Sequence, residues 1–89
     1  MRWLNNAEAV EIGRVTHFFS KISVAVVELK GTVSIGDRIW VRGAITDFQQ
    51  AVESMQIEHQ DVKSAGSGQS IGLKVAARVR EGDLVFKLT

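Results

Sequence analysis

The sequence predicts an all-β fold: a small, closed barrel of six antiparallel strands. Short runs rich in β-branched residues alternate apolar with polar side chains, and no stretch is convincingly helical. Eight glycines and no proline punctuate these runs. The 89 residues, 45% hydrophobic and 24% charged, suit one globular domain. Closure into a barrel would remove the sheet edges. We expect this domain to span residues 9–89, after an N-terminal extension of residues 1–8.

The six predicted strands cover residues 10–18, 22–29, 38–42, 48–58, 71–75 and 84–88. The second run is β-branched with few polar positions, which indicates that both of its faces are covered. The third alternates strictly, so Ile39 and Val41 should face inward. An exposed loop is expected at residues 63–70.

Two of these strands contain a slip in the alternation. In the first strand, Val10 and Ile12 share a face but Val15 is out of step. In the strand at 48–58, the phase breaks near Glu53 and Ser54. A β-bulge repairs such a slip and bends the strand, as the corners of a small barrel require.

One short pattern occurs twice. Residues 33–39 and 79–85 share the form V-x-x-G-D-x-[IV]. Glycine permits a positive φ, and aspartate can bond the backbone just ahead of it. Both segments are therefore predicted to be turns that lead into a strand.

The residues that most enzyme sites need are missing. Cysteine is absent, which excludes disulfides and thiolate catalysis. Residues 31–38 resemble a phosphate-binding loop in spacing, but Asp37 and Arg38 replace its Lys-Ser/Thr pair, so we expect no nucleotide site. His17 and His59 lack metal-ligand spacing. We expect no enzymatic activity, no metal and no cofactor.

Charge and hydropathy limit the partners. The net charge is only +1, so any affinity for RNA must come from local placement of basic residues. No apolar run approaches a membrane span, and the first residues lack the apolar stretch of a signal peptide. We expect a cytoplasmic protein without membrane contact. The oligomeric state stays open, and a monomer is compatible with the sequence.

Two basic–aromatic groups are candidate contact sites. If Ile39 and Val41 face inward, Arg38, Trp40 and Arg42 face outward together. There the indole could stack on a base while the arginines meet phosphates. In the alternative, the arginines lean over the indole as a solvated cation–π cluster, or Trp40 packs under the N-terminal segment.

The second group contains adjacent aromatic residues. Phe18 and Phe19 cannot both point into one face of a strand, and Lys21 follows them. One phenyl ring is therefore expected to contact a ligand or to cover an end of the barrel.

These segments also carry a family resemblance. From Gly13 to Leu88 the chain resembles domain two of the translational GTPases, of the elongation factor Tu and initiation factor type. The resemblance rests on five short motifs in the same order, at residues 23–29, 31–39, 52–55, 65–73 and 79–85. Residues 18–21 and 47–50 look closest to small stand-alone elongation-factor-like proteins. They also resemble the C-terminal barrel of the collagenase-like peptidase family, some of whose members act in RNA modification.

The resemblance implies a function for specific residues. In the GTPases this barrel touches the acceptor end of tRNA or ribosomal RNA. The corresponding positions here are Phe18, Phe19, Lys21, Gln56 and Ser70. No GTPase domain is present in the sequence, so the resemblance does not imply GTP hydrolysis.

We therefore expect a translation-factor-like module that binds tRNA or ribosomal RNA without GTPase activity. The alternative is a protein-interaction barrel that docks onto a GTPase, an RNA-modifying enzyme or another subunit. The near-neutral charge and the apolar residues Trp3, Phe18, Phe19 and Trp40 favour that alternative.

Overall fold

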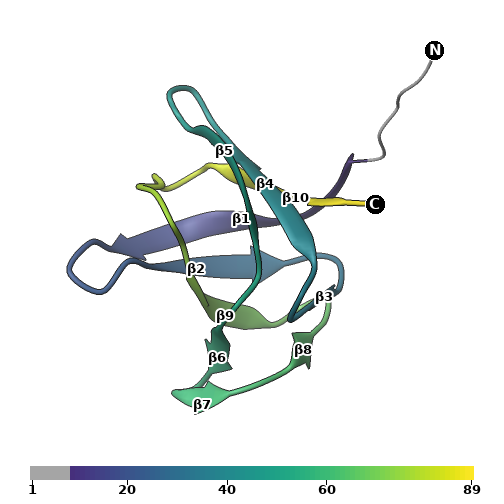
Figure 1. The fold of residues 1–89 in the computed structure, drawn as a ribbon. Helices are drawn as coiled ribbons and strands as arrows, with labels where there is room; N and C mark the ends of the chain where they lie inside the picture. The colour runs from purple at the N-terminus through teal and green to yellow at the C-terminus, as the bar shows by residue number, and fades with distance from the viewer. Residues whose placement is uncertain (1–8) are drawn as a thin grey trace.

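The computed structural model describes residues 9–89. The predicted extension at residues 1–8, which includes Trp3, lies outside the described residues. The described part folds into ten strands (Figure 1): β1 (Ala9–Phe19), β2 (Val24–Leu29), β3 (Val33–Ser34), β4 (Arg38–Arg42), β5 (Asp47–Ala51), β6 (Met55–Ile57), β7 (Gln60–Asp61), β8 (Ser64–Ala65), β9 (Ser70–Lys74) and β10 (Leu84–Leu88). No helix occurs between residues 9 and 89, so the all-β prediction is confirmed. Consequently no helix able to cross a membrane is found in this range.

The strands form two antiparallel sheets. The larger has eight strands in the order β5-β4-β10-β1-β2-β9-β6-β7, and β3 pairs with β8 in the smaller. Strand pairing ends at β5 and at β7, so hydrogen bonds between strands do not close the large sheet into a ring. The predicted count of six strands is wrong. Three strands of two residues each were missed, and the predicted strand at 48–58 is divided into β5 and β6.

The predicted phase slip in the first strand is confirmed. The register of β1 against β10 shifts between Glu11 and Gly13, and its register against β2 shifts between Val15 and His17. These irregularities let one long strand bend while it pairs on both sides. The slip near Glu53 and Ser54 is instead a break between β5 and β6. Within this break, Ser54 O accepts a hydrogen bond from Lys74 N at 3.1 Å.

The two copies of the V-x-x-G-D pattern form equivalent turns, as predicted. Gly36 and Gly82 have φ angles of 95° and 93°. The Oδ2 atom of Asp37 accepts a hydrogen bond from Ser34 N at 2.8 Å, and that of Asp83 accepts one from Arg80 N at 2.8 Å. Each turn leads directly into a strand, β4 or β10.

The core consists of inward side chains from most strands. Ile39 and Val41 are buried as the alternation predicted, at 0% and 1% exposure. They pack with Ile12, Val15, Ala25, Val27, Leu29, Val33, Val52, Met55, Ala65, Ile71, Leu73, Val75, Val79 and Val85. The core therefore fills the inner side of the sheet and leaves the outward side chains exposed to solvent.

Candidate functional site

The predicted site residues lie on two separate surfaces. Arg38, Trp40 and Arg42 lie along β4, while Phe19, Gln56 and Ser70 line one hollow over β1, β6 and β9. Two further residues belong to the hairpin between β1 and β2. Phe18 is half-buried against the core, whereas Lys21 is exposed in the turn.

The first surface, here the Trp40 face, is formed by the outward side chains of β4, β5 and β10. Trp40 lies opposite Phe86, and their ring centroids are 5.8 Å apart. The Trp40 Nε1–H donates to Asp47 Oδ1 at 2.7 Å. The guanidinium carbon of Arg42 lies 4.6 Å from the centroid of the indole. This is the cation–π arrangement considered from the sequence, and it leaves the indole N–H bonded within the protein.

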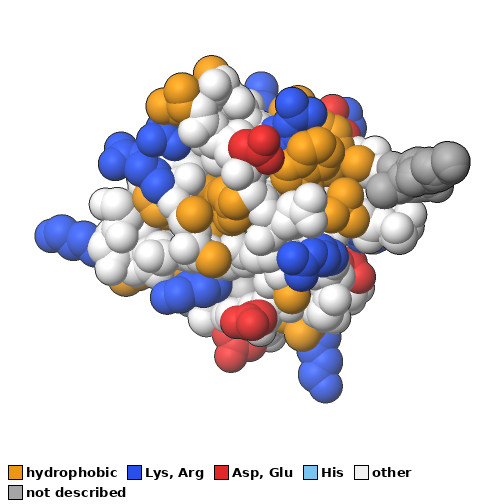
Figure 2. All heavy atoms as spheres, turned by 45° about the horizontal axis from the view of Figure 1, so that its top comes forward, with side chains coloured by type: hydrophobic (Ala, Val, Ile, Leu, Met, Phe, Trp, Pro, Cys, Tyr) orange, Lys and Arg blue, Asp and Glu red, His pale blue; other side chains and the backbone are white. Residues whose placement is uncertain are grey.

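Apolar side chains extend the Trp40 face along β10. Leu84, Phe86 and Leu88 are half-buried and lie opposite Arg42, Trp40 and Arg38, respectively. Figure 2 brings the side with β4, β5 and β10 forward and shows hydrophobic side chains gathered among basic and acidic ones. An apolar centre with a charged rim is the usual composition of a protein–protein interface.

The second surface, here the Phe19 hollow, has a volume of about 240 Å³. It is lined by Phe19, Ile22, Val24, Val26, Gln56, Glu58, His59, Ser70, Ile71 and Gly72. Phe19 and Ile22 are 48% and 57% exposed. The Phe19 ring packs edge-on against His17, with centroids 4.4 Å apart. Phe19, not Phe18, is therefore the exposed member of the aromatic pair.

Unusual backbone conformations border the Phe19 hollow. Ser23, Glu58 and His59 have φ angles of 56°, 50° and 66°. Among residues 9–89 these are the only non-glycine residues with positive φ. Glu58 and His59 form the two-residue turn between β6 and β7, where Asn-Gly is the usual choice. Sequence reasoning missed this turn because neither residue is typical of it.

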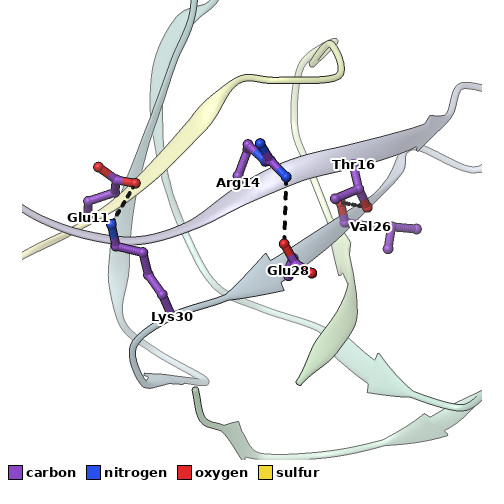
Figure 3. Close-up of polar contacts among 6 residues, drawn as sticks. All are labelled: Glu11, Arg14, Thr16, Val26, Glu28 and Lys30. Atoms are coloured by element: carbon purple, nitrogen blue, oxygen red, sulfur yellow. Dashed lines mark hydrogen bonds and ion pairs between the residues drawn. The ribbon is translucent and has the colours of Figure 1, made fainter. Parts of the chain in front are cut away.

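A third surface region, between β1 and β2, carries paired charges. Arg14 Nη2 lies 3.7 Å from Glu28 Oε1, and Lys30 Nζ lies 3.1 Å from Glu11 Oε2 (Figure 3). Nearby, Thr16 Oγ1 donates to Val26 O at 3.3 Å. Because each cation has an anion beside it, this region offers no concentrated charge for a phosphate or a metal.

Metal-ligating residues do not gather elsewhere in the described range. Between residues 9 and 89 no group of three or more His, Cys, Asp or Glu could hold a metal ion. His17 Nδ1 does lie 3.5 Å from Glu81 Oε2, but both side chains are largely exposed.

These features define the class of the molecule: a small antiparallel β domain that offers an aromatic outer face and a shallow apolar hollow. Solved structures of the same fold are C-terminal domains. Two crystal structures of the C-terminal domain of a protein from Geobacillus thermoleovorans, described as a U32 peptidase, each superpose with a TM-score of 0.80. They share 20% and 22% sequence identity with this chain, cover 84% and 85% of it, and are matched over 95% and 89% of their own length.

Sequence relatives are found among larger proteins. An uncharacterized protease of Methanocaldococcus jannaschii is 46% identical over 80 residues, which cover 89% of this chain and 20% of the relative. A collagenase of Porphyromonas gingivalis is 33% identical over 82 residues, 90% of this chain and 20% of the relative. The chain thus spans about a fifth of the length of these relatives. No protein-family model matches the sequence.

The comparisons overturn two predictions. The resemblance to domain two of the translational GTPases is wrong, because the similar sequences are a protease and a collagenase and the similar structures belong to a U32 peptidase. The predicted translation-factor function in tRNA or ribosomal RNA binding depended on that resemblance and is wrong with it. The five motifs misled because they consist of short strands and turns of kinds that many β domains share. The G-D turn occurs twice in this chain, at Asp37 and Asp83, which shows how little family information it carries.

Proposed function

We propose that this chain is a non-catalytic accessory domain of the U32 peptidase type, and that it docks onto the catalytic part of such a peptidase. One observation carries the proposal: nearly the whole chain matches only a fifth of a protease and of a collagenase. The catalytic residues of these relatives are therefore proposed to lie in the remaining four-fifths of their chains.

The Trp40 face is the proposed docking surface. Ala9, the first described residue, pairs with Leu88 beside this face. In the Geobacillus thermoleovorans protein the corresponding domain is C-terminal, so the rest of that protein enters at the equivalent end. A catalytic part joined there would meet Leu88, Phe86 and Trp40 first. Aromatic residues and arginine, both present here, dominate the energetics of protein interfaces.

We also propose that the large sheet closes into a barrel, as expected from the sequence. This closure is supported by the Gln50 side chain on the edge strand β5. Its Nε2 donates to Lys74 O at 3.0 Å, and its Oε1 accepts from Ala76 N at 2.7 Å. These bonds connect β5 with the end of β9 across the opening of the sheet. A cytoplasmic location is likewise proposed, from the absence of cysteine.

Calorimetry with the Methanocaldococcus jannaschii relative tests the docking. The relative is produced without the 80 residues that this chain matches, and this domain is titrated into it. We expect a one-to-one complex. The 80-residue segment of the relative, produced separately, should compete with this domain for binding. Trp40→Ala should weaken binding by about 2 kcal/mol, the usual effect of removing an aromatic anchor.

Phe19→Ala is the matched control, since it removes an aromatic ring from the other surface. Equal effects of the two substitutions would contradict docking through the Trp40 face. The absence of any heat of binding, with the competitor also inert, would contradict the docking proposal as a whole.

A further inference from the structure

We propose that the Phe19 hollow binds a polypeptide segment, with one apolar side chain in the hollow and a neighbouring basic side chain against the β6–β7 hairpin. This surface is separate from the Trp40 face and does not depend on the docking proposed above. The inference adds a second binding activity to the domain.

The size and lining of the hollow indicate a single side chain. Its volume of about 240 Å³ lies below the range of cofactor and drug-sized pockets, about 300–1,000 Å³. Phe19, Ile22, Val24 and Val26 supply an apolar wall, and Ser70 adds a polar group at the edge. An aromatic or branched aliphatic side chain matches this lining, because its burial removes apolar surface from water on both partners.

A glycine keeps the hollow open. Gly72 lies opposite Val26 in the β2–β9 pair and opposite Gln56 in the β6–β9 pair. A Cβ atom at Gly72 would approach Val24 Cγ1 to 3.3 Å, close to the floor of the hollow. Its φ is not in the left-handed region, so an alanine there causes no backbone strain. The absence of a side chain at this position therefore creates space on the outer side of the sheet.

Charge differs between the two ends of the hollow. At one end Lys21 is exposed in the β1–β2 turn, while the ammonium of Lys74 is already bonded to Ile22 O at 3.0 Å. At the other end, Glu58 lies in the β6–β7 turn and is the one Asp, Glu, Lys or Arg residue that lines the hollow. A basic side chain next to the apolar anchor is therefore attracted to the β6–β7 hairpin. The Glu58 carboxylate disfavours a phosphate at this end, which favours a polypeptide over a nucleic acid there.

The left-handed backbone at the border supports this assignment. Positive φ at non-glycine residues costs free energy and persists where the surrounding structure enforces it. Glu58 and His59 adopt it in the hairpin that forms one wall, and Ser23 adopts it at the end of the opposite turn. The tight β6–β7 turn holds the Glu58 and His59 side chains beside the hollow.

The position of the hollow leaves it free when the Trp40 face is docked. β1 runs from Ala9, beside the Trp40 face, to Phe19 at the hollow. Ten residue steps of a straight strand span roughly 33 Å; the bends in β1 shorten this distance, but a partner at one end need not cover the other.

Titration with short peptides, monitored by amide NMR shifts, tests the inference. The probe is acetyl-Gly-Phe-Lys-Gly-amide, and the comparison peptides replace Phe with Ser or Lys with Glu. We expect shifts at His59, Ser70 and Gly72, with a dissociation constant on the order of 1 mM. Both comparison peptides should bind more weakly, the Ser peptide most of all.

Two variants and one control complete the test. Gly72→Ala should weaken binding about tenfold, as expected when a methyl group occupies part of an apolar pocket. Ile22→Ser, at an exposed turn position, should weaken it without touching the core. Gly66→Ala, where a Cβ meets only Thr32 Cγ2 at 3.9 Å, should leave it unchanged.

Three results would overturn the proposal: no shifts at the hollow, equal binding of the Phe and Ser peptides, or stronger shifts there with oligouridylate than with the peptide. None of these depends on whether the Trp40 face docks onto a peptidase.

Discussion

Gly43→Ala should destabilise the domain through one buried carboxylate. A Cβ atom at Gly43 would lie 2.6 Å from Asp83 Cγ and closer still to its Oδ1. Asp83 is 4% exposed, and its Oδ2 accepts the hydrogen bond from Arg80 N that closes the turn before β10. The carboxylate therefore cannot move away from the new methyl group without losing that bond.

The magnitude follows from the two ways in which the structure can respond. If the carboxylate stays, the overpacking costs about 1–3 kcal/mol. If it swings out, a hydrogen bond to a charged group is lost, at about 1.5–3 kcal/mol. Either response predicts a loss of about 1–3 kcal/mol in the free energy of unfolding. Total stabilities of about 5–10 kcal/mol are usual for a domain of this size, so the variant should still fold.

Urea unfolding of a double-mutant cycle provides the assay. Asp83→Ala alone should cost about 2–3 kcal/mol, because it leaves Arg80 N without its partner. In the double variant the clash has disappeared, so Gly43→Ala should cost nothing further. A loss in the double variant equal to the sum of the two single losses would refute the reasoning. Gly66→Ala, which places a methyl group in ordinary contact, serves as the control and should change stability by less than about 0.5 kcal/mol.

Three further predictions concern local features. Gly82→Ala should cost about 1 kcal/mol in urea unfolding, because its φ of 93° disfavours any residue with a Cβ; no loss would mean that the turn is not left-handed in solution. His59→Gly should raise the unfolding free energy by up to about 1 kcal/mol, since glycine relieves the left-handed strain, and a lower melting temperature would contradict this. Arg14→Ala should change stability by less than about 0.5 kcal/mol, because its ion pair with Glu28 is solvent-exposed; a larger loss would show that the pair is stronger than its geometry indicates.

Much of the strand framework could be predicted from local sequence. Alternation placed Ile39 and Val41 inward and Trp40 outward, and the paired turns marked where β4 and β10 begin. The two-residue strands could not be predicted in this way. Val33 pairs with Ala65 across a distance of 32 residues, and two residues are too few to show a period.

The candidate surfaces were only partly predictable. Phe19 could not be distinguished from Phe18, because the irregularity between Val15 and His17 changes which side chains face outward beyond it. The left-handed turn at Glu58 and His59 carries no glycine or asparagine signal. Both features depend on contacts between strands distant in sequence rather than on local propensity.

The central position of β10 bears on how the chain folds. Residues 84–88 separate β4 from β1 in the large sheet, so the backbone pairing between strands reaches β4 and β5 only through them. Until those residues emerge from the ribosome, two incomplete pieces each expose an unsatisfied row of amide and carbonyl groups. The large sheet can therefore form only after residues 84–88 have been synthesised. We expect a synthetic peptide with the sequence of these residues to restore folding of a chain that lacks them.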